Sequence, residues 1–279
     1  MMSVAAHVVE AHGARIPLVG LGTWELRGRA CARVVEQALR LGYRHVDTAE
    51  LYDNEGEVGE GLRAAGIARE EVFVTTKVWP SHFAPHDLER SAQASLGRLR
   101  LSHVDLLLLH WPNPQVPLRD TLGALCKVKR AGLARHIGVS NFTVALIEKA
   151  VKLANEPLVC NQIEVHPFID QSKVIAACRR HGMATVAYSP IARGGASGHK
   201  VLARIGQAHG KTAAQVSLRF LVQQGIVVIP RTSRRERLSE NLAIFDFELS
   251  EAEMAEITRL ARRDGRIVDY AYSGSPQWD

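Results

Sequence analysis

The sequence predicts an α/β domain folded as a (β/α)8 TIM barrel, in which each of eight parallel strands leads into a helix. Eight short runs of β-branched or leucine residues alternate with amphipathic segments between residues 16 and 246. No linker-like change of composition interrupts the 279 residues, so we expect a single domain over residues 1–279. A doubly wound sheet would alternate similarly, but the first run is followed by GLGTWELRGRA, which lacks the GxGxxG spacing usual in that fold.

Taken in chain order, the apolar runs have the composition typical of parallel strands buried on both faces. The expected strands are residues 18–22, 44–49, 72–79, 105–111, 136–140, 160–166, 185–189 and 226–230. The segments between them predict helices; ARVVEQALRLG, for instance, places Val34, Val35, Ala38 and Leu39 on one face. Several of these segments end in a glycine, which favours a helix stop; the glycines are Gly42, Gly66, Gly132, Gly182 and Gly225.

Two further elements flank the barrel, which we place at about residues 17–246. The segment from about residue 6 to residue 16 predicts a β-hairpin that turns at His12–Gly13. Within the C-terminal segment 247–279, LSEAEMAEITRL predicts an extra helix capped at Ser250, and a tail follows it. No pattern in the sequence fixes the position of Trp278 in that tail.

The composition is that of a globular protein, with 46% apolar and 23% charged residues. The chain contains no apolar run of about 18 residues, the length that suggests a membrane span, and its first residues lack the pattern of a secretory signal. The four cysteines are widely spaced, so we interpret them as reduced packing residues of a cytoplasmic protein. His110 and His166 have no third ligand at a suitable spacing, so no metal is expected.

The net charge of +6 arises mostly from segments in which basic and acidic residues interleave, as on a solvated helix face. One basic cluster stands apart, PRTSRRER at residues 230–237. Its size suits a small polyanion better than a nucleic-acid duplex. We therefore expect a monomer that binds small molecules and that binds neither nucleic acid nor a membrane.

Polar residues occupy the carboxyl ends of the expected strands, where the catalytic groups of barrels collect. They are Asp47, Lys77, His110, Ser140, Asn141, Gln162, Tyr188 and Arg231. Lys77 lies in the apolar run VFVTTKVW, where an unpaired ammonium would cost several kcal/mol, so it needs a counter-charge. Asp47, at the end of the neighbouring strand, is the obvious partner, and Tyr52 follows it by five residues.

Each of these residues also has a structural explanation when it is taken alone. Lys77 and Asp47 could form a structural salt bridge, His110 could be an ordinary hydrogen-bonded strand end, and Tyr52 could pack on the surface. The convergence of all four on one mouth of a barrel favours a catalytic site instead.

Eight motifs in order resemble those of the aldo-keto reductases: GLGTW, YRHVDTAELYDNE, VTTKVW, DLLLLHWP, IGVSNF, NQIEVHP, YSP and VIPRTSRRERLSEN. The resemblance covers about residues 17 to 246 and is strongest to bacterial members that act on diketogluconate and methylglyoxal. It implies a barrel that reduces carbonyl compounds with NADPH. It also implies a catalytic tetrad of Asp47, Tyr52, Lys77 and His110.

The tetrad has a chemical rationale, because a carbonyl that receives a hydride needs a proton as negative charge grows on its oxygen. A free tyrosine, with a pKa of about 10, is a poor proton donor at neutral pH. A cation close to the phenol favours the phenolate and lowers that pKa. We expect Lys77 to supply the cation, Asp47 to hold Lys77, His110 to orient the substrate oxygen and Tyr52 to act as the acid.

The resemblance also implies the residues that hold the nicotinamide. Ser140, Asn141 and Gln162 would bind its carboxamide, since amide side chains offer both a donor and an acceptor, and Tyr188 would stack on the ring. Further cofactor contacts are expected from Gly22, Thr23, Trp24, Asp47, Ser189, Pro190 and Ile191.

The basic cluster predicts the other end of the cofactor. SRRE has the pattern of a capping box, so we expect a helix to begin at Ser233, and helix N-termini bind anions. Arg231 and Arg237 flank that start, and Thr232 and Ser233 add hydroxyls; Glu240 and Asn241 follow on the face of Arg237. This combination favours an adenosine 2′-phosphate and hence NADPH over NADH. Position 231 is Arg where many relatives have Lys, which keeps the charge.

Tryptophans lie at three strand ends where the resemblance to the aldo-keto reductases implies aromatic walls of the substrate pocket. Trp24, Trp79 and Trp111, with His110, would line a mostly apolar slot for an aldehyde or ketone. A second hypothesis is an NADPH-binding subunit that senses redox state for a partner protein with little turnover, although the intact tetrad argues against it. A hydrolase or isomerase barrel is a third; the chain lacks a carboxylate pair for it, and IARGG at 191–195 is the one candidate phosphate loop.

Overall fold

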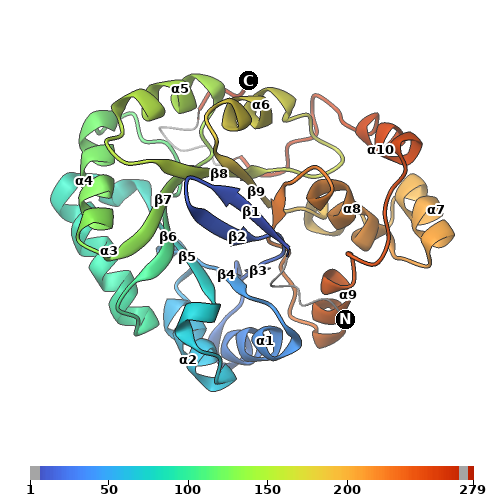
Figure 1. Cartoon of the computed structure of the whole chain (residues 1–279), viewed down its shortest axis with the longest axis horizontal. Coiled ribbons are helices and arrows are strands. Elements are labelled where there is room, and N and C mark those ends of the chain that lie inside the picture. The colour runs from blue at the N-terminus through green and yellow to red at the C-terminus, as the bar shows by residue number, and fades with distance from the viewer. Residues whose placement is uncertain (1–6, 270–275) are drawn as a thin grey trace.

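The computed structural model describes residues 7–269 and 276–279. Eight parallel strands form one sheet in chain order from β3 to β10 (Figure 1). They are β3 Leu21–Gly22, β4 His45–Asp47, β5 Phe73–Val78, β6 Val104–Leu109, β7 Ala134–Ser140, β8 Leu158–Glu164, β9 Ala184–Tyr188 and β10 Val227–Val228. Each overlaps one of the eight strands predicted from the sequence.

The sheet curls until its first and last strands meet. Val19 and Val228 form a parallel bridge, and the N–H of Gly20 donates to the carbonyl of Val228 at 2.8 Å. A parallel eight-stranded sheet that closes in this way fits the predicted (β/α)8 barrel.

Helices surround the sheet and cover its outer face (Figure 1). They are α1 Gly28–Leu41, α2 Glu55–Ala65, α3 Pro85–Leu99, α4 Leu118–Arg130, α5 Val144–Leu153, α6 Ser172–Arg180, α7 Lys200–His209, α8 Ala213–Val222, α9 Arg235–Leu242 and α10 Glu251–Thr258. Helix α1 buries the predicted face that includes Val35 and Ala38, and it stops at Gly42, whose φ of 111° lies in the left-handed region that favours glycine. At Ser250 both hydrogen bonds of a capping box with Glu253 are present.

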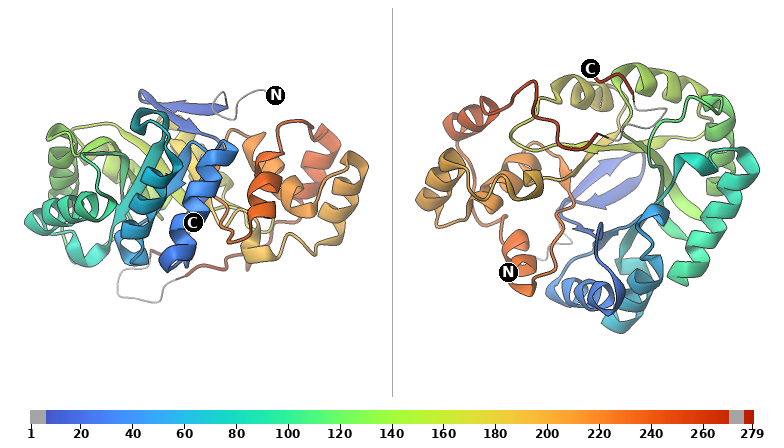
Figure 2. Two further views of the ribbon diagram at one scale, coloured as in Figure 1. Left: turned by 90° about the horizontal axis from the view of Figure 1, so that it is seen from below. Right: turned by 180° about the vertical axis from the view of Figure 1, so that it is seen from behind.

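The predicted hairpin is present as strands β1 Val8–Ala11 and β2 Ala14–Pro17. His12 and Gly13 at its turn have φ angles of 46° and 83°, as the tight turns of hairpins require. The hairpin lies at one end of the barrel (Figure 2) and packs Ile16 against inward-facing residues of the strands, such as Leu106 and Val186. Because the hairpin covers the amino-terminal end, the carboxyl end is the one that opens to solvent.

The residues described contain no helix long and apolar enough to cross a membrane. All four cysteines are buried free thiols.

Candidate active site

A cavity of about 350 Å³ opens at the carboxyl end of the barrel. Seven of the eight strands contribute to its lining, either directly or through the residues that follow them. From these strand ends come Gly22, Thr23, Trp24, Asp47, His110, Trp111, Asn141, Gln162, Tyr188, Ser189, Pro190, Ile191, Ile229 and Arg231. Parallel strands bring their ends to one rim, so residues far apart in sequence meet there.

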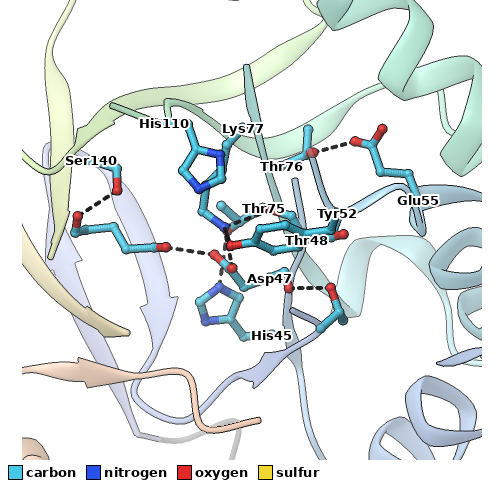
Figure 3. A network of polar contacts seen from close by, with 12 residues as sticks. His45, Asp47, Thr48, Tyr52, Glu55, Thr75, Thr76, Lys77, His110 and Ser140 are labelled. Atoms are coloured by element: carbon cyan, nitrogen blue, oxygen red, sulfur yellow. Dashed lines mark hydrogen bonds and ion pairs between the residues drawn. The ribbon is translucent and has the colours of Figure 1, made fainter. Parts of the chain in front are cut away.

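Lys77 and Asp47 form a buried ion pair beneath this cavity (Figure 3). The Lys77 side chain is 0% exposed, and its Nζ donates to Asp47 Oδ1 at 2.5 Å and to the carbonyl of Thr48 at 2.8 Å. Burial lowers the pKa of Lys77, and the Asp47 carboxylate opposes that shift. The second oxygen of Asp47 accepts a hydrogen bond from Gln162 Nε2 at 2.7 Å, so the carboxylate has partners on both sides.

Tyr52 returns over this pair from a short 3-10 turn, η2 Glu50–Tyr52. The Tyr52 hydroxyl lies 3.3 Å from Lys77 Nζ. The same Nζ lies 4.9 Å from the centre of the Tyr52 ring. Asp53 ends the turn with a φ of 51°, and the guanidinium of Arg27 donates to the Tyr52 carbonyl. The turn explains the spacing of five residues, because it lets Asp47 remain on the strand while Tyr52 folds back above it.

His110 lies beside the Tyr52 ring, with ring centres 5.6 Å apart (Figure 3). Burial, and then the charge of Lys77, lower the pKa of His110 well below its ordinary value. The imidazole is therefore neutral at neutral pH and can exchange a hydrogen bond with a bound oxygen without carrying charge. Trp79 packs edge-on against it with ring centres 5.2 Å apart.

Amide and hydroxyl side chains form a second network beside the tetrad. Asn141, in the left-handed region with φ 63°, donates to the carbonyl of His110 at 3.0 Å and to Ser140 Oγ at 3.1 Å. Tyr188 donates to Asn141 Oδ1 at 2.7 Å, and Ser140 donates to the carbonyl of Gln162 at 2.7 Å. The structure thus brings together the four residues predicted to hold a nicotinamide, although Ser140 is turned toward β8 and is not in the cavity lining.

Two arginines of the basic cluster line the same cavity. Arg231 donates through Nε to the carbonyl of Trp24 at 3.1 Å and lies 3.7 Å from the carboxylate of Glu25, and Arg237 comes from helix α9. A network of amide and hydroxyl side chains and two guanidiniums on one cavity match the two ends of a nicotinamide dinucleotide, a carboxamide and phosphates. The residues present therefore fit such a cofactor.

The predicted helix start at Ser233 is wrong. Helix α9 begins at Arg235, and Arg234 at the N-cap position makes no side-chain capping bond. Thr232 forms a local turn just before the helix, in which its hydroxyl accepts the N–H of Arg234 at 3.1 Å.

Several predicted cofactor residues lie away from the cavity lining. Glu240 accepts a hydrogen bond from the hydroxyl of Thr212 on the α8 side at 2.5 Å, and Asn241 is buried against Tyr43, to which it hydrogen-bonds. Thr232 is buried and Ser233 is exposed, and neither lines the cavity.

Three of the predicted substrate residues, Trp24, His110 and Trp111, line the cavity. Trp79 does not, and reaches the site through its contact with His110. Trp278 packs edge-on against Trp111 with ring centres 5.9 Å apart, and the guanidinium of Arg266 lies 3.5 Å from the centre of the Trp278 ring.

The cavity also has lining residues that were not predicted as site residues, namely Glu25, Leu51, Arg193, Gly194, Ile229 and Val268. The glycines of IARGG marked the loop that carries Arg193, but not the arginine itself. Val268 gave no signal, because backbone bonds hold it: Glu164 accepts the N–H groups of Ile267 at 2.7 Å and Val268 at 2.8 Å. No group of three or more His, Cys, Asp or Glu side chains suited to a metal occurs in residues 7–269 and 276–279.

The fold and the site together define a barrel oxidoreductase with a phenol placed against a buried ammonium–carboxylate pair. The profile of the Aldo/keto reductase family matches residues 18–262, and the chain belongs to that family.

Known relatives agree with this assignment. Methylglyoxal reductase DkgB of Escherichia coli O157:H7 is 38% identical over 267 residues, 95% of this chain and 99% of the relative. Glyoxal reductase of Bacillus subtilis (strain 168) is 39% identical over 257 residues, 92% of each chain. A crystal structure provisionally assigned as a 2,5-diketo-D-gluconic acid reductase B has a TM-score of 0.96 at 48% identity, covering 98% of this chain and 97% of its own. The aldo-keto reductase of Bombyx mori in complex with NADP has a TM-score of 0.90 at 32% identity, covering 96% and 98%.

Proposed function

We propose that the protein reduces aldehydes and ketones, including small dicarbonyls and sugar-derived carbonyls, to alcohols with NADPH, and that Tyr52 donates the proton. The observation that carries this proposal is the Tyr52 hydroxyl 3.3 Å from the buried Lys77 Nζ at the floor of the cavity. The substrate class rests on relatives named for methylglyoxal, glyoxal and diketogluconate.

Bound NADPH would supply the hydride, and the chain would hold it through two sets of residues. Asn141, Gln162 and Tyr188 would fix the nicotinamide end, and Arg231 and Arg237 would bind the phosphates through charge-assisted hydrogen bonds. The NADP that one structural neighbour carries supports the same choice of cofactor.

The proton transfer follows from the contacts of the tetrad. As charge develops on the carbonyl oxygen, Tyr52 releases its proton to that oxygen, and the resulting phenolate lies beside the Lys77 ammonium, which stabilises it. Asp47 keeps Lys77 charged despite its burial, because the carboxylate is 2.5 Å from the ammonium. Neutral His110 orients the oxygen, and water returns a proton to Tyr52 afterwards.

The test is turnover of methylglyoxal with NADPH, followed through oxidation of the cofactor. The parent should turn over, and Tyr52→Phe should lose about a thousandfold in kcat, within the range of general acid catalysis, while its Kd for NADPH stays within about twofold of the parent value. A Tyr52→Phe variant as fast as the parent would contradict the proton-donor role. A parent that binds NADPH but reduces no carbonyl in a panel of dicarbonyls and sugar aldehydes would favour the redox-sensing alternative.

A further inference from the structure

A largely buried acid, Glu50, stands next to the tetrad and takes no part in the mechanism above. It is the first residue of the turn η2 and precedes Tyr52 by two positions. Its side chain is 9% exposed. A carboxylate at that depth requires hydrogen-bond partners, so the groups around it indicate what it does.

The partners of Glu50 come from the next segments of the barrel wall. The backbone N–H of Trp79 and the hydroxyl of Ser91 on α3 both donate to the carboxylate. His82 Nδ1 lies 3.1 and 3.2 Å from its two oxygens, and the His82 side chain is half exposed. Trp79 directly follows β5 and stands two residues beyond Lys77.

Glu50 therefore joins the turn that carries Tyr52 to the strand that carries Lys77. The ladder between β4 and β5 reaches Asp47 opposite Thr75, and the N–H of Thr48 then donates to the carbonyl of Thr75 at 2.9 Å. After Thr48 the chain leaves the sheet. The Glu50 carboxylate attaches it to β5 again, beyond Lys77.

Other bonds hold the opposite side of the turn to the loop after β3. Arg27 donates to the carbonyl of Tyr52, and the side chain of Asn54 donates to the carbonyls of Thr23 at 2.8 Å and Leu26 at 3.0 Å. These bonds fix the turn relative to β3, whereas the bonds of Glu50 fix it relative to β5. The separation of 3.3 Å between Tyr52 Oη and Lys77 Nζ is at the long end of hydrogen bonding, so a small shift of the turn would break the contact.

We propose that Glu50 is a positioning residue that sets the distance between the Tyr52 phenol and the Lys77 ammonium. The proposal rests on the proposed function for its effect on turnover, but not for its geometry. The same carboxylate fixes the backbone of Trp79, whose ring contacts His110, so it places two sides of the reacting centre.

Two substitutions separate this role from simple stabilisation. Glu50→Ala removes the link to β5, whereas Glu50→Gln keeps an oxygen for the Trp79 N–H and an amide for Ser91. We expect Glu50→Ala to lose about thirtyfold in kcat, since a displacement of about 1 Å can cost a hundredfold, with Kd for NADPH within about twofold. Glu50→Gln should stay within about threefold of the parent, so that the conservative variant rescues the activity.

The second readout requires no turnover. Phenolate formation at Tyr52 can be followed by absorbance during a pH titration. For each protein, the titration curve of the same protein carrying Tyr52→Phe is subtracted, which leaves the contribution of Tyr52. Glu50→Ala should form this phenolate at a higher pH than the parent, because the phenol has moved away from Lys77. Glu50→Gln should titrate like the parent.

Two control variants complete the experiment. Asp105→Ala removes a carboxylate that accepts the N–H of Val74 at 2.9 Å. Like the contact between Glu50 and Trp79, this bond joins a carboxylate to a backbone N–H, but at the other end of β5. The variant should lower stability without moving the Tyr52 titration. His82→Ala leaves the bond from Trp79 in place and should change neither readout.

The outcomes are distinct. A Glu50→Ala variant that loses stability yet titrates like the parent at Tyr52 would overturn the positioning role. A parent that reduces no carbonyl, together with a shifted titration in Glu50→Ala, would overturn the proposed function and retain the positioning role.

Discussion

The two ends of the barrel each bury a carboxylate beside β5, and the two carboxylates have different cationic partners. At the amino-terminal end, Asp105 accepts the N–H of Val74 and receives guanidinium groups from Arg69 at 2.7 Å and Arg135 at 3.2 Å. At the carboxyl end, Asp47 faces one fully buried ammonium, that of Lys77, at 2.5 Å.

The difference lies in what each cation can do. A guanidinium stays protonated and binds a carboxylate through a fixed fork, and Arg69 and Arg135 remain partly exposed, so the amino-terminal cluster is suited to stability. An ammonium that is removed from solvent loses its proton more readily, and burial lowers the pKa of Lys77 in this way. Such an ammonium also affects any ionisable neighbour strongly, and that neighbour is Tyr52. Stability and chemistry thus occupy opposite ends of the same strands.

The largest expected effect comes from removing the ammonium. Lys77→Met should lose about a thousandfold in kcat, because the phenolate loses its counter-charge, and should cost about 3 kcal/mol of unfolding free energy, because Asp47 is left buried without a cation. Kinetics and urea unfolding would measure the two quantities. Adding Asp47→Asn should restore most of the stability and none of the activity; recovery of both would show that Lys77 has only a structural role.

Asp105→Ala tests the other end. Loss of a carboxylate that three groups contact should lower the unfolding free energy by about 3 kcal/mol while kcat stays within about twofold. Denaturant unfolding and steady-state kinetics on the same preparation would check this. A large fall in kcat without loss of stability would mean that the two ends are not separate in function.

His45 lies between the two ends, where its Nε2 is 3.1 Å from Thr75 Oγ1, and burial lowers its pKa to about 4. In the unfolded chain its pKa is about 6.5, so the unfolded state takes up a proton between these values and the folded state does not. Stability should therefore be complete above about pH 6.5 and fall as the pH drops toward 4, by up to about 3 kcal/mol from His45 alone. Urea unfolding at several pH values should give a shallower slope for His45→Gln; equal slopes would remove this assignment.

The smallest effect concerns the cofactor. Arg237→Ala should raise the KM for NADPH about tenfold, the equivalent of about 1.4 kcal/mol, and leave the KM for NADH nearly unchanged, because the lost guanidinium would serve the 2′-phosphate. Arg235→Ala, in the same helix but absent from the cavity lining, is the matched control. Equal effects on both nicotinamides would remove the role of Arg237.

The sequence was sufficient for the strands and for the convergence of the tetrad, because both follow from local patterns and one rule of barrel geometry. Lys77 in an apolar strand required a partner, and Asp47 on the adjacent strand is that partner. Contacts that the backbone makes could not be predicted from the sequence. Val268 reaches the cavity through its N–H bond to Glu164, which no side-chain pattern records.

The two capping patterns in the sequence had different outcomes. At Ser250 the pattern gave the helix start correctly. At Ser233 it did not: the helix begins at Arg235, two residues later than predicted, with Arg234 at the N-cap position.

The central claim is that Lys77 makes the phenol of Tyr52 acidic, and titration of that phenol is its most direct test. The absorbance of the parent minus that of Tyr52→Phe isolates one of the five tyrosines; among the others, burial raises the pKa of Tyr43 and so keeps it out of the lower range. The account predicts phenolate at a pH clearly below the ordinary value of about 10, and a shift back toward that value in Lys77→Met. An ordinary titration in the parent, unchanged by Lys77→Met, would contradict it.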